Sequence, residues 1–332
     1  MIAGDSLSIV MPVFNEEAHL PATLDGLVGA VADSAFDAEL VLVDDGSTDA
    51  SQEVARARID GRIPLRVVSQ PNRGRFEARR AGLGAAEGEH VLFLDARVIL
   101  EPSALQFVHD HLDGARVWNA HVHVVADGVL EDFWRLLAEL AWPDYFDEPR
   151  TTSFGLADFD RFPTGTTCFF APRSLLASAF DSFRSQYADV RLANDDTPIL
   201  RAVAASERIH ISPGFACTYS PRTTVASFLR HAFHRGTVFV DGHGRPESRF
   251  FPYVVGFFPL SAAVGLVALR RPWVLPASLA ACGIAAAAYG GWLGRPARDL
   301  RTLALATPLY AAGHSLGMWR GAYELVRGAA AQ

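Results

Sequence analysis

Two side chains of opposite charge follow a short apolar run in the first third of the chain. The run Val91–Leu94 is followed by Asp95, Ala96 and Arg97. A single carboxylate can hold magnesium when water and phosphate oxygens supply the other ligands. An arginine is instead a fixed cation that can bind phosphate itself. Three interpretations follow: weakened metal use, a metal-free phosphate site, or an arginine turned away to pair with an acid such as Glu101.

A second acidic cluster lies about a hundred residues later. Asp195 and Asp196 are adjacent and precede an apolar, helix-like stretch. A carboxylate placed opposite a leaving group can take the proton of an acceptor hydroxyl, and one neighbour of a pair can raise the other's pKa. The alternative is a polar residue that caps the following helix.

Buried strands and amphipathic helices alternate through the first hundred residues, at a spacing typical of βαβ units. This order predicts an α/β fold with a parallel sheet and helices on both faces. In such sheets ligands bind beyond the carboxyl ends of the strands, where Asn15-Glu16, Asp44-Asp45-Gly46 and Asp95 all fall. The predicted strands are residues 7–14, 40–43, 65–69 and 91–94, and the predicted helices are a stretch carrying Leu20, Leu24, Leu27 and Val31 and residues 75–86.

The charge differs between the two parts of the chain. Residues 1–220 hold 18 Arg and 33 Asp plus Glu, whereas residues 221–332 hold 12 Arg and 4 acids. The net acidic front part excludes a nucleic-acid partner, which would need basic surface. The basic, apolar back part suits an anionic membrane surface. The three cysteines have no CxxC spacing, which favours reduced thiols over a disulfide framework or a zinc site.

Three uncharged stretches near the C-terminus are each close to the length that crosses a bilayer as a helix. They predict a membrane domain over 251–332, after a domain at 1–220 and an amphipathic connector at 221–250. The start of the chain lacks a signal-peptide pattern, so we expect a multi-pass protein of the cell membrane with its front domain in the cytoplasm. The stretches are residues 251–269, 273–293 and 302–319.

Several short motifs resemble the family 2 glycosyltransferases, whose catalytic domain has the GT-A fold. Residues 11–16 read MPVFNE and residues 43–49 read VDDGSTD. Residues 72–74, 78–79 and 88–95 continue the match in the family's order as NRG, AR and GEHVLFLD. The resemblance is close over residues 6–110 and looser over 160–240. It implies a GT-A domain followed by C-terminal transmembrane helices.

The resemblance also implies roles for individual residues. Asp95 matches the first aspartate of the family's metal-binding DxD motif, so a divalent cation (Mg or Mn) is implied, although Arg97 replaces the second aspartate. Asp196 matches the general base, with Asp195 as the alternative one residue earlier. In 228–236 only Arg235 matches a (Q/R)xxRW-type motif, and an interfacial helix is the alternative there. The residues implied to bind the nucleotide sugar are Pro12, Phe14, Glu16, Asp44, Asp45, Arg79, Asp95, Arg97 and Arg235.

By resemblance, the chain would move a sugar, with inversion, from a nucleotide diphosphate donor to a lipid-linked or cell-envelope glycan acceptor. A polyprenyl phosphate is the alternative acceptor. Because that acceptor is already ionised and needs no strong base, the Asp195-Asp196 pair favours a hydroxyl. A second hypothesis is that the chain is not an enzyme but a scaffold that binds a sugar nucleotide, and the presence of Arg97 in place of the second aspartate supports it. A soluble enzyme with a helical C-terminal domain is the third.

Overall fold

The computed structural model describes residues 5–221 and 224–329. The chain forms two compact units that each combine separate stretches of sequence. The first comprises the residues up to His123, Trp142–Arg184 and Asp195–Ser220. The second comprises Val124–Ala141, Ser185–Asn194 and the residues from Pro221 onward. The domain boundaries predicted from the sequence, at 220 and 250, stay a prediction.

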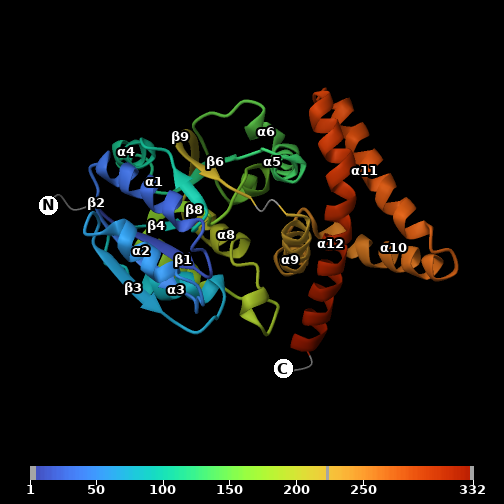
Figure 1. Cartoon of the computed structure of the whole chain (residues 1–332), viewed down its shortest axis with the longest axis horizontal. Helices are drawn as coiled ribbons and strands as arrows, with labels where there is room; N and C mark the ends of the chain where they lie inside the picture. The colour runs from blue at the N-terminus through green and yellow to red at the C-terminus, as the bar shows by residue number, and fades with distance from the viewer. Residues whose placement is uncertain (1–4, 222–223, 330–332) are drawn as a thin grey trace. The chain divides into compact units, whose positions relative to one another are not determined.

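A mixed sheet of nine strands forms the centre of the first unit (Figure 1). Its order is β3-β2-β1-β4-β8-β6-β9-β5, and β7 pairs with β9. The neighbours among β1 to β4 are parallel, whereas the pairs β4–β8, β6–β8, β5–β9 and β7–β9 are antiparallel. The strands are β1 (Ser6–Val13), β2 (Asp37–Asp44), β3 (Leu65–Ser69), β4 (His90–Leu94), β5 (Val98–Leu100), β6 (Trp118–Val124), β7 (Thr152–Phe154), β8 (Cys168–Pro172) and β9 (Ile209–Tyr219).

The predicted α/β fold is confirmed, but the prediction of a parallel sheet holds only for the first four strands. Short connections can join antiparallel strands, so the later strands lack the βαβ spacing that signals a parallel sheet. Strand β8 reaches β4 from about seventy residues further along the chain and lies antiparallel to it, with Leu94 opposite Cys168. Because of this pairing, the residues just before β8 lie near the end of β4, which Asp95 follows.

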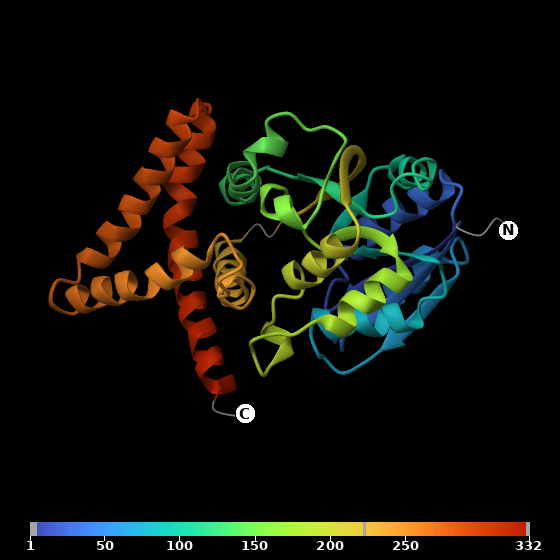
Figure 2. The same ribbon diagram turned by 180° about the vertical axis from the view of Figure 1, so that it is seen from behind.

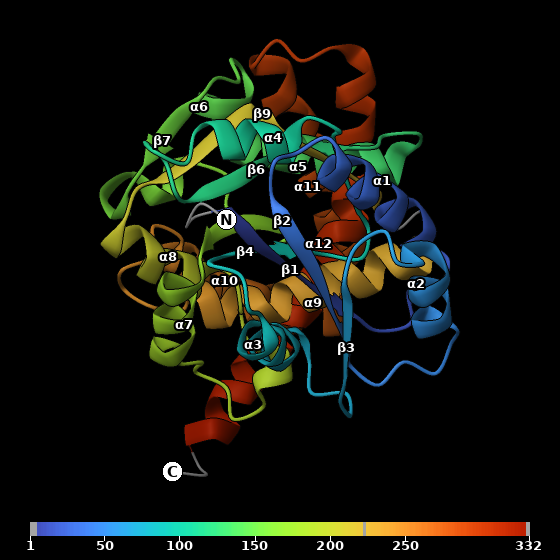
Figure 3. The same cartoon turned by 90° about the vertical axis from the view of Figure 1, so that its left-hand side faces the viewer.

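Helices cover both faces of the sheet (Figure 3). Ile9 and Met11 of β1 pack with Leu24 of α1 in the core of one face. On the other face, α3 approaches so closely that a Cβ at Gly82 would lie 2.3 Å from Val10. The helices of this unit are α1 (Leu20–Ala32), α2 (Ser51–Ile59), α3 (Arg75–Ala85), α4 (Ala104–Asp110), α6 (Pro143–Phe146), η1 (Leu156–Arg161), α7 (Arg173–Ser182) and α8 (Thr197–Ser206).

The second unit is helical (Figure 2). By length and composition, α10 and α11 could each cross a membrane, and few of their residues are buried. The predicted stretch 302–319 lies inside the much longer α12, so the number of spans stays a prediction. The helices are α5 (Val129–Ala141), η2 (Val190–Leu192), α9 (Val225–His243), α10 (Phe251–Arg270), α11 (Val274–Trp292) and α12 (Ala297–Ala329).

Candidate active site

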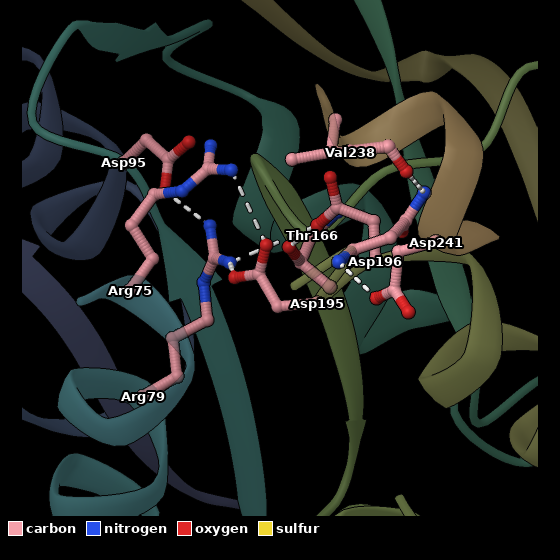
Figure 4. Close-up of polar contacts among 9 residues, drawn as sticks. Arg75, Arg79, Asp95, Thr166, Asp195, Asp196, Val238 and Asp241 are labelled. Atoms are coloured by element: carbon pink, nitrogen blue, oxygen red, sulfur yellow. Dashed lines mark hydrogen bonds and ion pairs between the residues drawn. The ribbon is translucent and has the colours of Figure 1, made fainter. Parts of the chain in front are cut away.

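Arg79 of α3 joins the two acidic motifs of the sequence (Figure 4). Its guanidinium, 1% exposed, donates to Asp95 Oδ1 at 2.7 Å and to Asp195 Oδ2 at 2.5 Å. It also lies 3.7 Å from Asp196 Oδ1. A helix, the end of β4 and the start of α8 therefore converge on one buried cation. Arg79 and the aspartates predicted from the sequence meet here.

The two adjacent aspartates have different surroundings. The side chain of Asp195 is 3% exposed and contacts Arg79 and Arg75, whereas that of Asp196 is 35% exposed. Asp196 occupies the N-cap position of α8, but its side chain makes no capping hydrogen bond. Its Oδ1 instead accepts the hydroxyl of Thr166, from the segment before β8, and the Thr166 amide at 3.3 Å. Asp196 is thus the more accessible carboxylate, and helix capping does not explain it.

These contacts set the charge states of the pair. Burial raises the pKa of Asp195, although Arg75 and Arg79 oppose the effect. For Asp196, burial acts in the same direction, but Arg79, Arg75 and the Thr166 hydroxyl outweigh it and lower its pKa. Burial would also lower the pKa of Arg79, but the surrounding carboxylates outweigh it and raise that pKa. At neutral pH, Asp196 is therefore an ionised carboxylate beside a permanent cation.

Arg97 turns toward the first predicted cluster. Its Nε lies 2.9 Å from Glu16, at the end of β1, and both side chains are mostly buried. Arg97 therefore pairs with an acid, as one interpretation expected, but that acid is Glu16 rather than Glu101, which accepts a hydrogen bond from Thr218. Nε is only one of the donors of a guanidinium, so the pair holds Arg97 in place while its terminal nitrogens can bind a further group.

The DxD-like segment offers one carboxylate for a cation. Within the described residues no three His, Cys, Asp or Glu side chains form a metal-binding group. Asp95 uses Oδ1 for Arg79, which leaves Oδ2. Magnesium commonly takes one or two carboxylates and completes its shell with water and substrate phosphates, so Asp95 fits a cation that a diphosphate brings with it.

Asp44 and Asp45 order the loops at the ends of β1 and β2. Asp44 accepts a hydrogen bond from the Ser47 amide at 2.9 Å and so stabilises the turn after β2. The turn also needs Gly46, which has a φ of +82°. Asp45 Oδ1 and Oδ2 accept the backbone amides of Arg73 and Gly74, each at 2.8 Å. Asp45 therefore holds the loop that leads into α3, which carries Arg75 and Arg79.

The other predicted residues are more scattered. Pro12 lies on β1 beside Val43, and Phe14 follows that strand with 47% of its surface exposed. Arg235 belongs to α9 in the second unit, where its guanidinium lies 5.7 Å from the centroid of the Trp134 ring. The roles predicted for all these residues in binding the nucleotide sugar stay predictions.

Two residues of the site are absent from the sequence-based set of site residues. Arg75 lies one turn before Arg79 on α3, and this spacing on one helical face is the signal that could have indicated it. Thr166 lies in a short stretch of small residues just before β8. Its contact with Asp196 depends on the antiparallel strand β8, which no local pattern predicts.

The model of the family described as "Glycosyl transferase family 2" matches residues 8–180, more than half of the chain. The chain belongs to this family. The match covers the motifs around Glu16, Asp45 and Asp95, and it ends before Asp195 and Asp196. Family membership therefore rests on the first acidic motif and its neighbours, while the second motif is placed by the structure.

Two sugar transferases are similar to this chain over fewer than 100 residues. An undecaprenyl-phosphate 4-deoxy-4-formamido-L-arabinose transferase of Aeromonas hydrophila is 40% identical over 92 residues, 27% of this chain and 28% of the relative. The enzyme of the same name from Pseudomonas aeruginosa is 42% identical over 94 residues, 28% of each chain. The match spans less than a third of either relative.

Solved glycosyltransferase structures share the fold. The mannosyltransferase PcManGT of Pyrobaculum calidifontis, in complex with GDP-Man and Mn²⁺, superposes with a TM-score of 0.56 at 18% identity, over 96% of this chain and 88% of the other. S. aureus TarS in complex with UDP-GlcNAc gives 0.53 at 17% identity, over 93% and 92%. At this identity the likeness establishes the GT-A fold of the family 2 member and nothing finer.

Proposed function

We propose that this family 2 glycosyltransferase moves a sugar, with inversion, from a nucleotide diphosphate donor to a hydroxyl of a lipid-linked or cell-envelope glycan. The single observation that carries the proposal is the contact of Arg79 with both Asp95 and Asp195. It brings together a donor-side carboxylate and a second acidic motif that a nucleotide-binding fold alone does not require. A site with both parts can hold a leaving diphosphate and take up an acceptor proton.

On the donor side, Glu16 and Asp45 would contact the base or ribose, and Arg97 would reach the diphosphate. Charge grows on the diphosphate as its bond to the sugar breaks, and arginines fixed in place stabilise that charge without reorganisation. The ion pair with Glu16 holds Arg97 in this way. When bound, a divalent cation held by Asp95 would neutralise part of the same charge.

On the acceptor side, Asp196 would be the general base. The acceptor oxygen forms the new bond to the anomeric carbon, its proton passes to the Asp196 carboxylate, and the bond to the nucleoside diphosphate breaks on the opposite face. The contacts with Arg79 and Thr166 keep Asp196 ionised, which is the state that accepts a proton. The buried Asp195 would instead anchor Arg79.

The second unit supplies the reason for a lipid-linked acceptor. Helices α10 and α11 are long and apolar enough to cross a bilayer, and their large apolar side chains are exposed. We propose that they hold the enzyme in the cell membrane, in a multi-pass arrangement with the first unit on the cytoplasmic side. The names of the characterised relatives specify undecaprenyl phosphate, which is itself a membrane lipid.

Transfer to a polyprenyl phosphate is the second candidate. Two observations favour it: the relatives' names, and the lowered pKa of Asp196, which makes this carboxylate a weak base. A phosphate acceptor is already ionised and takes no benefit from a base. The two candidates therefore differ in what they require of Asp196.

The variant Asp196→Asn separates them. Detergent-purified protein would be given labelled UDP- and GDP-sugars with polyprenyl phosphate in one series and membrane glycolipid extract in another. A hydroxyl acceptor predicts a fall in transfer of about 10²–10⁴-fold in the variant. A phosphate acceptor predicts transfer to polyprenyl phosphate that changes little. Asp181→Asn, at an exposed position of α7, is the matched control. Nucleotide binding without transfer in the wild type would mean a scaffold.

A further inference from the structure

The ten residues before the catalytic pair are held by one buried carboxylate. Asp241 of α9 is fully buried, and its Oδ1 accepts the Gln186 amide at 2.7 Å. Its Oδ2 accepts the Asn194 amide at 2.7 Å and the Ser185 hydroxyl at 3.0 Å. A single side chain thus fixes both ends of the segment 185–194, and Asn194 is bonded to Asp195.

This arrangement depends on the carboxylate. A buried carboxylate is costly unless its oxygens are hydrogen-bonded, and backbone amides aimed at it meet that need. The converse also holds, since the amides of Gln186 and Asn194 would lose their acceptors if the carboxylate were removed. Because these hydrogen bonds are directional, they favour one conformation of the segment 185–194.

Other atoms of α9 hold the same segment. The Tyr187 hydroxyl donates to the Thr237 carbonyl at 2.7 Å, and the Gln186 side chain donates to the Asp241 carbonyl at 2.8 Å. A Cβ at Gly242 would come within 2.1 Å of the side-chain nitrogen Nδ2 of Asn194, so a larger residue there would displace that side chain. Several atoms of α9 therefore hold the segment at its two ends.

Helix α9 is in turn fixed to α12 by close backbone approach. A Cβ at Gly317 of α12 would lie 1.9 Å from the carbonyl oxygen of Phe233, and one at Gly313 would lie 2.9 Å from that of Leu229. At such distances one helix cannot rotate or slide without a clash. The support beneath the segment is consequently a packed pair of helices rather than one isolated helix.

We propose that Asp241 is a positioning residue for sugar transfer: it orders the segment 185–194, which is joined through Asn194 to Asp195 and Asp196. The inference rests on the proposed function for its catalytic consequence. Asp241 takes no part in the chemistry. It acts because catalysis tolerates little misplacement of a base, and a shift of about 1 Å can lower a rate about 10²-fold.

The variant Asp241→Asn tests this most cleanly. Asparagine has nearly the same shape but one acceptor oxygen, so its amide group must face the amide of Gln186 or of Asn194. We expect kcat for transfer to fall about 10- to 100-fold, with the donor KM within roughly threefold of wild type. In an Asp196→Asn background the same change should have almost no further effect, because residues that act as a unit are not additive.

Hydrogen exchange gives a readout that needs no activity. In Asp241→Asn, amides of residues 186–196 should exchange faster while those of β1 to β4 keep their protection. If the wild type transfers no sugar, the proposed function fails by itself, and the exchange pattern still decides whether Asp241 orders the segment. Unchanged exchange there, or an equal fall of kcat in both backgrounds, would overturn the inference.

Two further variants show whether a loss of activity in Asp241→Asn comes only from a loss of folding. Asp132→Asn removes another buried carboxylate of the second unit, which binds Arg135 and Thr302 and does not contact the segment. It should leave kcat within about twofold of wild type. Tyr187→Phe removes one anchor of the segment and leaves Asp241 in place. It should lower kcat about two- to tenfold, the value of one hydrogen bond, and an unchanged kcat in this folded variant would contradict the inference.

Discussion

The guanidinium of Arg79 donates to Asp95 across 2.7 Å, and the same group reaches Asp195. Asp95 and Asp195 therefore share one buried cation. Arg79 and Asp195 are both buried, so removal of Arg79 would leave the buried Asp195 carboxylate without its closest cation.

Replacement of this cation should affect both stability and activity. Arg79→Leu leaves Asp195 buried without its closest partner, and we expect a loss of about 3–5 kcal/mol in the free energy of unfolding. Transfer should fall to background. Thermal unfolding and a transfer assay would check both. Arg80→Ala, which removes an exposed guanidinium that pairs with Glu77 and lies over the ring of Phe76, should change stability by less than about 1 kcal/mol.

Arg97 should control the need for a metal. Charge-assisted hydrogen bonds contribute about 1.5–3 kcal/mol, so Arg97→Ala should weaken nucleoside diphosphate binding at least about tenfold. If Arg97 has taken over the work of a cation, EDTA will leave wild-type binding unchanged but will abolish the residual binding of the variant. An Arg97→Ala protein that binds as tightly as wild type would rule out contact with the diphosphate.

The pH dependence of transfer should reflect the arginines around Asp196. The base acts in its ionised form, which is present above its pKa, and that pKa lies below the ordinary value of 3.8. Wild-type kcat should therefore show no acid limb between neutral pH and about pH 5. Arg75→Ala removes one of the lowering charges, so its acid limb should move to higher pH. Profiles of kcat taken down to about pH 3.5 would compare the two proteins, and a wild-type acid limb above about pH 5 would count against Asp196 as the base.

Close packing of α9 on α12 should make Gly317 intolerant of substitution. A valine there would place atoms on the Phe233 carbonyl, and overpacking of this kind costs about 1–3 kcal/mol or more. Gly317→Val should therefore lower the unfolding temperature in detergent. Gly265→Ala, on α10 with open space around its Cβ, is the control and should unfold like wild type.

Membrane association has a direct test. Sedimented membranes washed at high salt and alkaline pH should retain the protein, and detergent should release it, because spans of about 20 apolar residues do not leave a bilayer. Release by the salt wash alone would favour the soluble enzyme with a helical C-terminal domain.

Local sequence patterns predicted the first half of the fold well. The strand expected at 91–94 is β4, the helix expected at 75–86 is α3, and the turn at Gly46 has the positive φ that glycine permits. These features follow from periodicity and turn chemistry within a few residues. The family motifs likewise indicated Asp95, Asp195 and Asp196 as members of one site.

Contacts between distant segments could not be predicted in this way. The pairing of Arg97 with Glu16 and the bridge formed by Arg79 depend on how strands β1 and β4 and helix α8 converge. Thr166 reaches Asp196 only because β8 runs antiparallel beside β4. The hydrogen bonds from the amides of Gln186 and Asn194 to Asp241 join segments some fifty residues apart, and no local sequence pattern predicts them.

Binding of the donor nucleotide tests the central claim most directly. Calorimetry would titrate detergent-purified protein with UDP and with GDP, each with and without magnesium or manganese. We predict that one nucleotide binds and that Asp45→Ala, which releases the loop before α3, abolishes the heat of binding while Asp181→Asn retains it. Absence of binding for both nucleotides, with either metal present, would contradict the assignment of this site to a UDP- or GDP-sugar.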